Sequence, residues 1–202
     1  MTSTQTPASS RATPLTKVVF SVAALALLAD VVTKVVVVAA IKPGQQPHRL
    51  LAGLVYLQQA RNSGAAFSVG PGATLVLTGI SLVVVAIIVR VASRLSSRGW
   101  AVAFGLVLGG ALGNLADRIF RAPGVGRGHV VDWISVFKPD AQVWPIFNLA
   151  DSAIVVGGVL VVVLSIFGVG LTGRRRSDPS AGSETAVVNS APVQPTGSQP
   201  DA

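Results

Sequence analysis

The chain has 202 residues, of which 50% are hydrophobic and only 12% are charged, and its mean hydropathy is +0.64. Soluble domains carry about 25% charged residues, so this composition excludes an ordinary soluble globule and indicates a membrane protein. The absence of cysteine excludes disulfides, thiolate nucleophiles and cysteine-ligated metals. The formal charge of +8 comes without a basic stripe of interleaved aromatic residues, which disfavours nucleic-acid binding and favours basic flanks beside membrane segments.

Both ends of the chain are polar and rich in Ser, Thr and Pro. Residues 1–14 and 177–202 contain too few apolar groups to order themselves, so we expect disordered extensions there. Three consecutive arginines, at 174–176, precede the second of these extensions. The sequence therefore predicts one folded domain over residues 15–171, followed at 172–202 by a basic stop and a disordered cytoplasmic tail.

Four apolar segments lie between these ends, and each is long enough to span or nearly span a bilayer at about 1.5 Å per residue. They cover residues 15–41, 73–91, 100–116 and 146–171. The first resumes after Lys34 as a further apolar run, which makes it longer than the apolar region of a cleaved signal peptide. In the third, Gly105, Gly109 and Gly113 recur every four residues and predict a glycine face for close helix packing. The predicted fold is an all-α membrane protein with four transmembrane helices.

Four spans place both termini on the same side of the membrane. The 16 Lys and Arg residues divide equally between the two sides. Those of the termini and of the 92–99 loop are concentrated at helix ends, whereas the others are spread over longer loops beside aspartates. This density favours cytoplasmic termini, and it places the loops 42–72 and 117–145 on the outer side.

Each of the two outer loops predicts a small surface element. The 42–72 loop mixes apolar, polar and small residues and has turn chemistry at Asn62-Ser63-Gly64, which predicts a short β-hairpin or cradle at the membrane surface. The 117–145 loop contains HVVDWISVF, and its apolar residues predict a short interfacial helix around 132–137 with Trp133 as an aromatic anchor.

Every acidic residue of the predicted domain is an aspartate at an outer helix end or in an outer loop. They are Asp30, Asp117, Asp132, Asp140 and Asp151. Ionisable residues at membrane depth are costly, which makes them functional candidates. The i,i+4 spacing of Asp30 and Lys34 predicts an ion pair with a structural role at the end of the first helix.

Asp132 and Asp151 have surroundings that suit acid–base chemistry. Asp132 lies among apolar and aromatic residues, and Asp151 lies just inside the fourth apolar segment, so desolvation favours the protonated carboxyl in both. Two aspartates that share one proton can activate a water and protonate a leaving group. Asp117, next to Arg118, suits a structural anchor better, but spacing alone would equally allow it to be the partner of Asp151.

Other chemistries fit the sequence less well. His48 and His129 are far apart in loops, which disfavours a two-histidine metal site, and Lys34 is already paired with Asp30 and so unsuited to activate a serine. Transport of protons or cations is an alternative, but its path would need charges at the midplane rather than at one membrane face. A non-enzymatic membrane scaffold is a second alternative, which would leave the outer aspartates unexplained.

Five short stretches resemble the lipoprotein signal peptidases, also called signal peptidase II. They are DVVTK (30–34), RNSGAAFS (61–68), GNLADR (113–118), HVVDW (129–133) and FNLADS (147–152). Each is weak alone, but together they stand in the family's order and at family-like spacing on four spans. Ser63 replaces an aromatic residue often found there, and the tail is long.

The resemblance implies an intramembrane aspartic endopeptidase that removes the signal peptide from diacylglyceryl-modified prolipoproteins by cutting before the lipidated cysteine. It implies no metal or organic cofactor, and inhibition by the cyclic peptide globomycin. The expected partners are prolipoproteins and membrane lipids, and we expect a monomer in the bacterial inner (plasma) membrane with its active site at the outer face. The implied roles are catalytic for Asp132 and Asp151, substrate-binding or dyad-positioning for Asn62, Asn114, Arg118 and Asn148, and structural for Asp30, Lys34 and Asp117.

Overall fold

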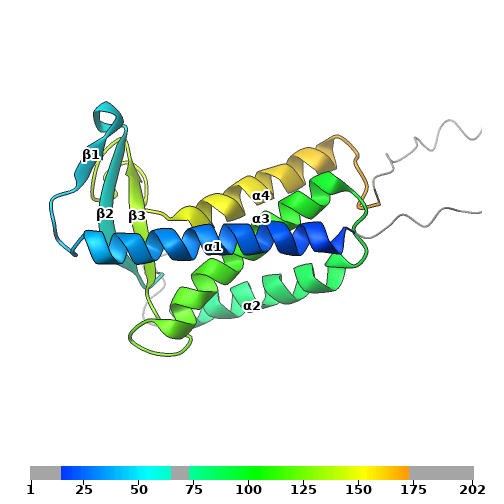
Figure 1. Cartoon of the computed structure of the whole chain (residues 1–202), viewed down its shortest axis with the longest axis horizontal. Helices are drawn as coiled ribbons and strands as arrows, with labels where there is room; N and C mark the ends of the chain where they lie inside the picture. The colour runs from blue at the N-terminus through cyan, green and yellow to red at the C-terminus, as the bar shows by residue number, and fades with distance from the viewer. Residues whose placement is uncertain (1–14, 65–72, 173–202) are drawn as a thin grey trace, which may run out of the picture.

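The computed structural model describes residues 15–64 and 73–172. Four long helices form a bundle, and a small antiparallel sheet lies across one end of it (Figure 1). The predicted disordered extensions, at 1–14 and 177–202, lie outside the described residues, as does part of the predicted cradle, at 65–72.

The helices are α1 (Thr16–Ala40), α2 (Ala73–Ala92), α3 (Arg98–Phe120) and α4 (Leu149–Ile166). Each is long and apolar enough to cross a membrane, which confirms the predicted four-helix, multi-pass architecture. Many large apolar side chains of α1, α2 and α4 point outwards, as expected where lipid surrounds the bundle. α3 continues to Phe120 rather than ending at 116, so Asn114 and Asp117 lie within the helix and share its geometry.

α3 is the central helix, and it packs against α1, α2 and α4. The predicted glycine face is confirmed, and it is turned towards α1. A Cβ at Gly105 would lie 2.7 Å from the Cβ of Val22, and one at Gly109 would lie 2.6 Å from the carbonyl oxygen of Ala23. Because no side chain fits into these spaces, glycine lets the backbones of α1 and α3 approach more closely than any other residue would.

The start of α1, the α2–α3 connection and the end of α4 meet at the end of the bundle opposite the sheet (Figure 1). The backbone N–H of Leu15 donates to the carbonyl of Leu95 at 2.7 Å, and the Trp100 indole N–H donates to the carbonyl of Val169 at 2.8 Å. Both ends of the folded chain therefore lie on the same side of the bundle, as an even number of spans requires.

The sheet contains β1 (His48–Leu50), β2 (Val55–Asn62) and β3 (Val130–Val136) in the order β1-β2-β3. A short 3-10 turn, η1 (Leu51–Gly53), joins β1 to β2, so the predicted hairpin forms with its turn at η1. The predicted turn residues Asn62-Ser63-Gly64 instead end β2, where the Gly64 N–H donates to the Asn62 side-chain oxygen at 2.8 Å.

The prediction of an interfacial helix around 132–137 is wrong, because this segment is strand β3. Its β-branched residues, such as Val131 and Ile134, favour strand geometry. β2 pairs with β3 on one side, and on the other the Ile134 N–H donates to the carbonyl of Phe147 at 2.8 Å. Trp133 is not an exposed anchor but is half-buried against the cluster of Val37 and Val131 that joins the sheet to α1.

Gly157 and Gly158 provide a matched pair that tests how closely α4 packs on α3. A Cβ at Gly157 would lie 2.7 Å from the carbonyl oxygen of Ala103, whereas one at Gly158 meets nothing within 4 Å. We expect Gly157→Ala to destabilise the fold by about 1–3 kcal/mol, because the helices must separate. Gly158→Ala should be neutral or slightly stabilising, since alanine favours helix. Thermal unfolding of the purified protein in detergent measures both, and equal unfolding temperatures would contradict the close contact.

Candidate active site

Polar side chains from five elements meet where the bundle joins the sheet. Most of the predicted site residues are buried there, and the remaining three, Asn62, Arg118 and Asp151, are half-buried. The residues come from α1, β2, α3, β3 and the start of α4. Segments that are distant in the sequence thus supply one connected polar cluster.

Lys34 lies at the centre of this cluster and is only 1% exposed. Its Nζ lies 2.7 Å from Asp30 Oδ2 and 3.0 Å from Asp117 Oδ2, and it donates to Asn114 Oδ1 at 3.2 Å. A buried ammonium is stable only when its hydrogens and its charge are all compensated. The predicted Asp30–Lys34 ion pair is confirmed, and Asp117 joins it from the neighbouring helix.

Asp30 and Asp117 each bind the backbone beside a candidate catalytic residue. Asp30 Oδ1 accepts from the N–H of Ala150 at 2.9 Å, and Asp117 Oδ2 accepts from the N–H of Val131 at 3.1 Å. Ala150 directly precedes Asp151, and Val131 directly precedes Asp132. The ion pairs of α1 and α3 thereby position the start of α4 and the middle of β3.

Asp117 pairs with Arg121 and not with its neighbour in the sequence, Arg118. The i,i+4 spacing of Asp117 and Arg121, on one helical face, was the signal that could have identified this partner. Spacing alone left Asp117 as a possible partner of Asp151, but both of its oxygens are bound to Lys34, Arg121 and β3. Arg118 lies close enough to Asp151 for the carboxylate charge to act on its guanidinium.

Asp132 is held in β3 by two side-chain amides and is only 2% exposed. The Nδ2 of Asn62 donates to its Oδ2 at 2.9 Å, and the Nδ2 of Asn148 donates to its Oδ1 at 2.7 Å. Burial, with a further contribution from the negative charge of Asp151, raises the pKa of Asp132 to about 7, although the two amide donors oppose the rise. Asp132 can therefore carry a proton near neutral pH.

Asp151 is fixed by the N-terminal cap of α4. Asn148 is the cap residue: its side-chain oxygen accepts from the N–H of Asp151 at 2.9 Å, and its own N–H donates to Asp151 Oδ2 at 3.2 Å. This reciprocal pattern is a capping box, which the Asn-x-x-Asp spacing encodes. The second oxygen of Asp151 accepts from Asn114 Nδ2 at 2.7 Å.

Asn148 therefore contacts both candidate catalytic carboxylates. Its side-chain Nδ2 binds Asp132, while its backbone N–H binds Asp151. Asp132 and Asp151 are also close enough for the charge of one to shift the pKa of Asp132. Two carboxyl groups arranged around one asparagine, one of them able to hold a proton, have the features required for general acid–base catalysis on a water.

A largely apolar cavity of about 330 Å³ opens beside Asp151 along the first turns of α4. Its walls include Trp144 and Phe147, which precede the helix, and Val155 and Val156 within it. We did not predict this cavity from the sequence. The aromatic residues just before the fourth apolar segment were its only signal. The cavity therefore places apolar side chains beside one carboxylate of the polar cluster.

Comparison with known proteins agrees with this geometry. Residues 22–167 match the family model described as signal peptidase (SPase) II. The lipoprotein signal peptidase of Rhodococcus jostii (strain RHA1) is 49% identical over 157 residues, covering 78% of this chain and 76% of the relative. The lipoprotein signal peptidase of Mycobacterium tuberculosis (strain ATCC 25618 / H37Rv) is 49% identical over 164 residues, covering 80% of this chain and 78% of the relative.

A bacterial membrane enzyme solved by the in meso method at 1.9 Å resolution has a similar fold. The TM-score is 0.65 at 25% sequence identity, and the match covers 77% of this chain and 97% of that enzyme. The family model spans most of the chain, and each of these relatives is 49% identical to it over more than three quarters of its length. The chain therefore belongs to the signal peptidase II family.

Proposed function

We propose that this protein is an intramembrane aspartic endopeptidase that removes the signal peptide from diacylglyceryl-modified prolipoproteins. In this proposal it cuts the peptide bond before the lipidated cysteine, with Asp132 and Asp151 as the catalytic pair. The observation that carries the proposal is the contact of Asn148 with both carboxylates, in a chain of the signal peptidase II family. The substrate class follows from relatives that are named lipoprotein signal peptidases.

The two aspartates have different roles in the proposed reaction. Asp132, whose pKa is about 7, carries the proton, and Asp151 acts as the ionised base. Asp151 removes a proton from water as the water oxygen bonds to the scissile carbonyl carbon, while Asp132 donates its proton to the carbonyl oxygen. When the carbon–nitrogen bond breaks, the proton on Asp151 passes to the leaving amine and the hydroxyl proton returns to Asp132.

The remaining polar residues of the cluster act on the pair. Asn62 and Asn148 bind Asp132, and Asn114 binds Asp151, so both carboxylates keep their orientation before substrate arrives. Arg118 is the positive charge we assign to substrate binding beside the pair. In this proposal the side chains of Asp132 and Asp151 carry out every proton transfer of the reaction.

The substrate approaches from the membrane. The apolar cavity beside Asp151 suits the hydrocarbon of the diacylglyceryl group or of the signal peptide. The catalytic pair lies at the sheet end of the bundle, opposite the end where the folded chain begins and ends. With both termini cytoplasmic, as the distribution of Lys and Arg favours, the pair faces the outer side of the bacterial inner membrane.

Substitution of either catalytic aspartate tests the proposal directly. We expect Asp132→Asn and Asp151→Asn each to reduce cleavage by at least about a thousandfold, because each removes one proton-transfer group. The measurement is cleavage of a purified diacylated prolipoprotein in reconstituted vesicles, with and without globomycin. Asp140→Asn is the control, because Asp140 is an exposed aspartate on the same side of the bundle. Full activity of either Asp132→Asn or Asp151→Asn would refute the assignment.

The substitution Asp117→Asn tests whether Asp117 stabilises the fold or takes part in the catalytic step. Asp117 compensates Lys34 and Arg121, so we expect its substitution to lower the free energy of unfolding by about 3–5 kcal/mol. Because Asp117 takes no part in the proposed proton transfers, the fraction that remains folded should keep most of its kcat. Thermal unfolding combined with active-site titration of the folded fraction measures both. A stable but inactive Asp117→Asn variant would instead make Asp117 a member of the catalytic machinery.

The pKa of Asp132 predicts the pH dependence of cleavage. A protonated Asp132 is present below about pH 7 and is lost above it, so kcat/KM should fall as the pH rises through about 7. The Asn62 donor stabilises the ionised form of Asp132. Asn62→Ala should therefore raise the pKa of Asp132 and shift this alkaline limb to higher pH. A limb that shifts to lower pH, or stays in place, would contradict Asp132 as the proton donor.

A further inference from the structure

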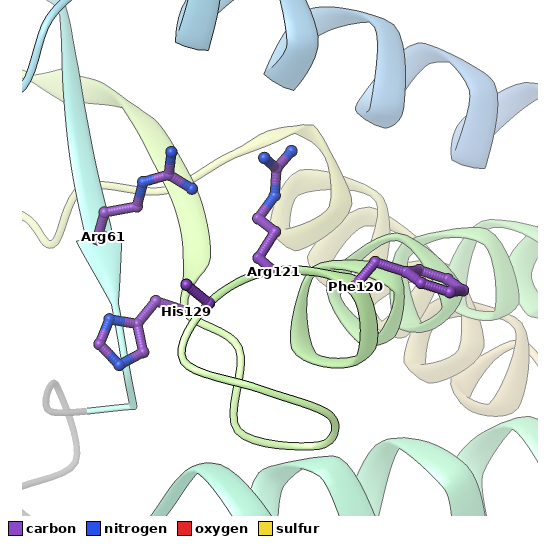
Figure 2. Close-up of a pocket in the computed structure, with 5 residues that line it drawn as sticks. Arg61, Phe120, Arg121 and His129 are labelled. Carbon is purple, nitrogen blue, oxygen red and sulfur yellow. The ribbon is translucent and has the colours of Figure 1, made fainter.

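A second cavity, of about 470 Å³, opens where the ends of β2 and α3 approach each other (Figure 2). Arg61 lines it from β2, Phe120 and Arg121 from the end of α3, and Ala122 and His129 from the loop that follows. Three of these five described residues are basic and none is acidic. The proposed reaction uses none of the five.

The two arginines direct their charges into the same space. Figure 2 shows the guanidinium groups of Arg61 and Arg121 rising from opposite walls of the cavity. Burial, with a further contribution from the positive charge of Arg121, lowers the pKa of Arg61. Arg61 is exposed and the negative charge of Asp117 opposes this shift, but both guanidinium groups line one cavity, and an anion between them relieves their mutual repulsion.

Among the residues that the structure describes, no carboxylate forms an ion pair with Arg61. Asp117 already forms ion pairs with Arg121 and Lys34, and its charge acts on Arg61 only from a distance. Arg61 donates from Nε and Nη2 to the side-chain oxygen of Gln59, at 3.2 and 3.1 Å, with that amide turned to face it. Gln59 is neutral, so this contact satisfies hydrogen bonds without neutralising the positive charge.

An apolar extension leads from this cavity along the helices. A smaller cavity, of about 220 Å³, shares Phe120 and Arg121 with the first and continues past Ala116 of α3 and Val31 of α1. Asp117 also lines it, with its carboxylate paired as described. Phe120 is the last residue of α3 and is 84% exposed, which is typical of an aromatic side chain at the boundary between hydrocarbon and headgroups.

We propose that the two adjoining cavities form a binding site for an anionic phospholipid. Its phosphate lies between the guanidinium groups of Arg61 and Arg121, and one acyl chain runs along Val31 and Ala116. Guanidinium groups match phosphate oxygens in pairs of hydrogen bonds, and the cationic cavity lies at the end of a membrane span, where lipid phosphates are found. The apolar extension favours a lipid over free phosphate or an acidic peptide, because neither of these has a hydrocarbon chain to fill it.

The site is separate from the apolar cavity beside Asp151, and its occupancy does not depend on the proposed catalytic roles. The lipid site is nevertheless adjacent in the sequence to the proposed catalytic cluster, because Arg61 directly precedes Asn62, which binds Asp132. A lipid bound here would hold the end of β2 beside the catalytic pair. The proposed lipid is therefore a bound structural component of the protein and not its substrate.

The test measures binding of short-chain phosphatidylglycerol to the full-length protein in neutral detergent. Thermal unfolding is recorded as the lipid is titrated, because a ligand that binds only the folded state raises its stability with concentration. We expect saturable stabilisation by phosphatidylglycerol and little by phosphatidylcholine with the same chains. Arg61→Gln should weaken binding by about tenfold, the effect of losing one charged hydrogen-bonding partner.

Arg127→Gln is the matched control, because Arg127 is an exposed arginine in the same loop as His129 and does not line either cavity. Equal weakening by Arg61→Gln and Arg127→Gln would overturn the site in favour of general surface attraction. Inorganic phosphate that binds as tightly as the lipid would overturn the role of the acyl chain. Competition by an acidic peptide would assign the cavity to a polypeptide. The same titration with Asp132→Asn should give the wild-type result, so failure of the proposed function leaves this inference standing.

Discussion

The compensation of one buried ammonium group determines much of this structure. Lys34 lies almost wholly out of contact with solvent, in a bundle whose helices are otherwise apolar, and such a charge is stable only with a full set of partners. Its carboxylate partners, Asp30 and Asp117, use their remaining oxygens to bind the backbone at Ala150 and Val131. The electrostatic requirement of a lysine in α1 thus fixes the positions of β3 and α4, the two elements that carry the proposed catalytic pair.

The two aspartates of that pair lie in different electrostatic environments, which gives a physical basis for their different proposed roles. Asp151 lies in the first turn of α4, where the helix dipole favours negative charge and the backbone N–H of Asn148 donates to the Asp151 carboxylate. Asp132 lies in a strand, buried, with only neutral amides as direct side-chain partners. The position at the helix terminus thus suits Asp151 to the proposed role of ionised base. The buried position in the strand suits Asp132 to the proposed role of protonated acid.

Features encoded by local spacing could be predicted from the sequence, and features that need distant partners could not. The spans, the glycine face of α3 and the Asp30–Lys34 pair follow from run length and helical periodicity. The strand at 130–136 was mistaken for a helix because its hydrogen-bonding partner, β2, lies far away in the sequence. Arg118 was taken as the partner of Asp117 because it is adjacent, whereas helix geometry brings Arg121 to the same face. The cationic cavity combines elements that only the folded chain brings together.

The capping box of α4 has a consequence for biosynthesis. Asn148 begins the final helix and, with the same side chain, holds Asp132. A nascent chain therefore completes the pair only when α4, the last of its spans, has entered the membrane and formed its first turn. In the proposed mechanism, the catalytic pair therefore forms only after this helix is in place.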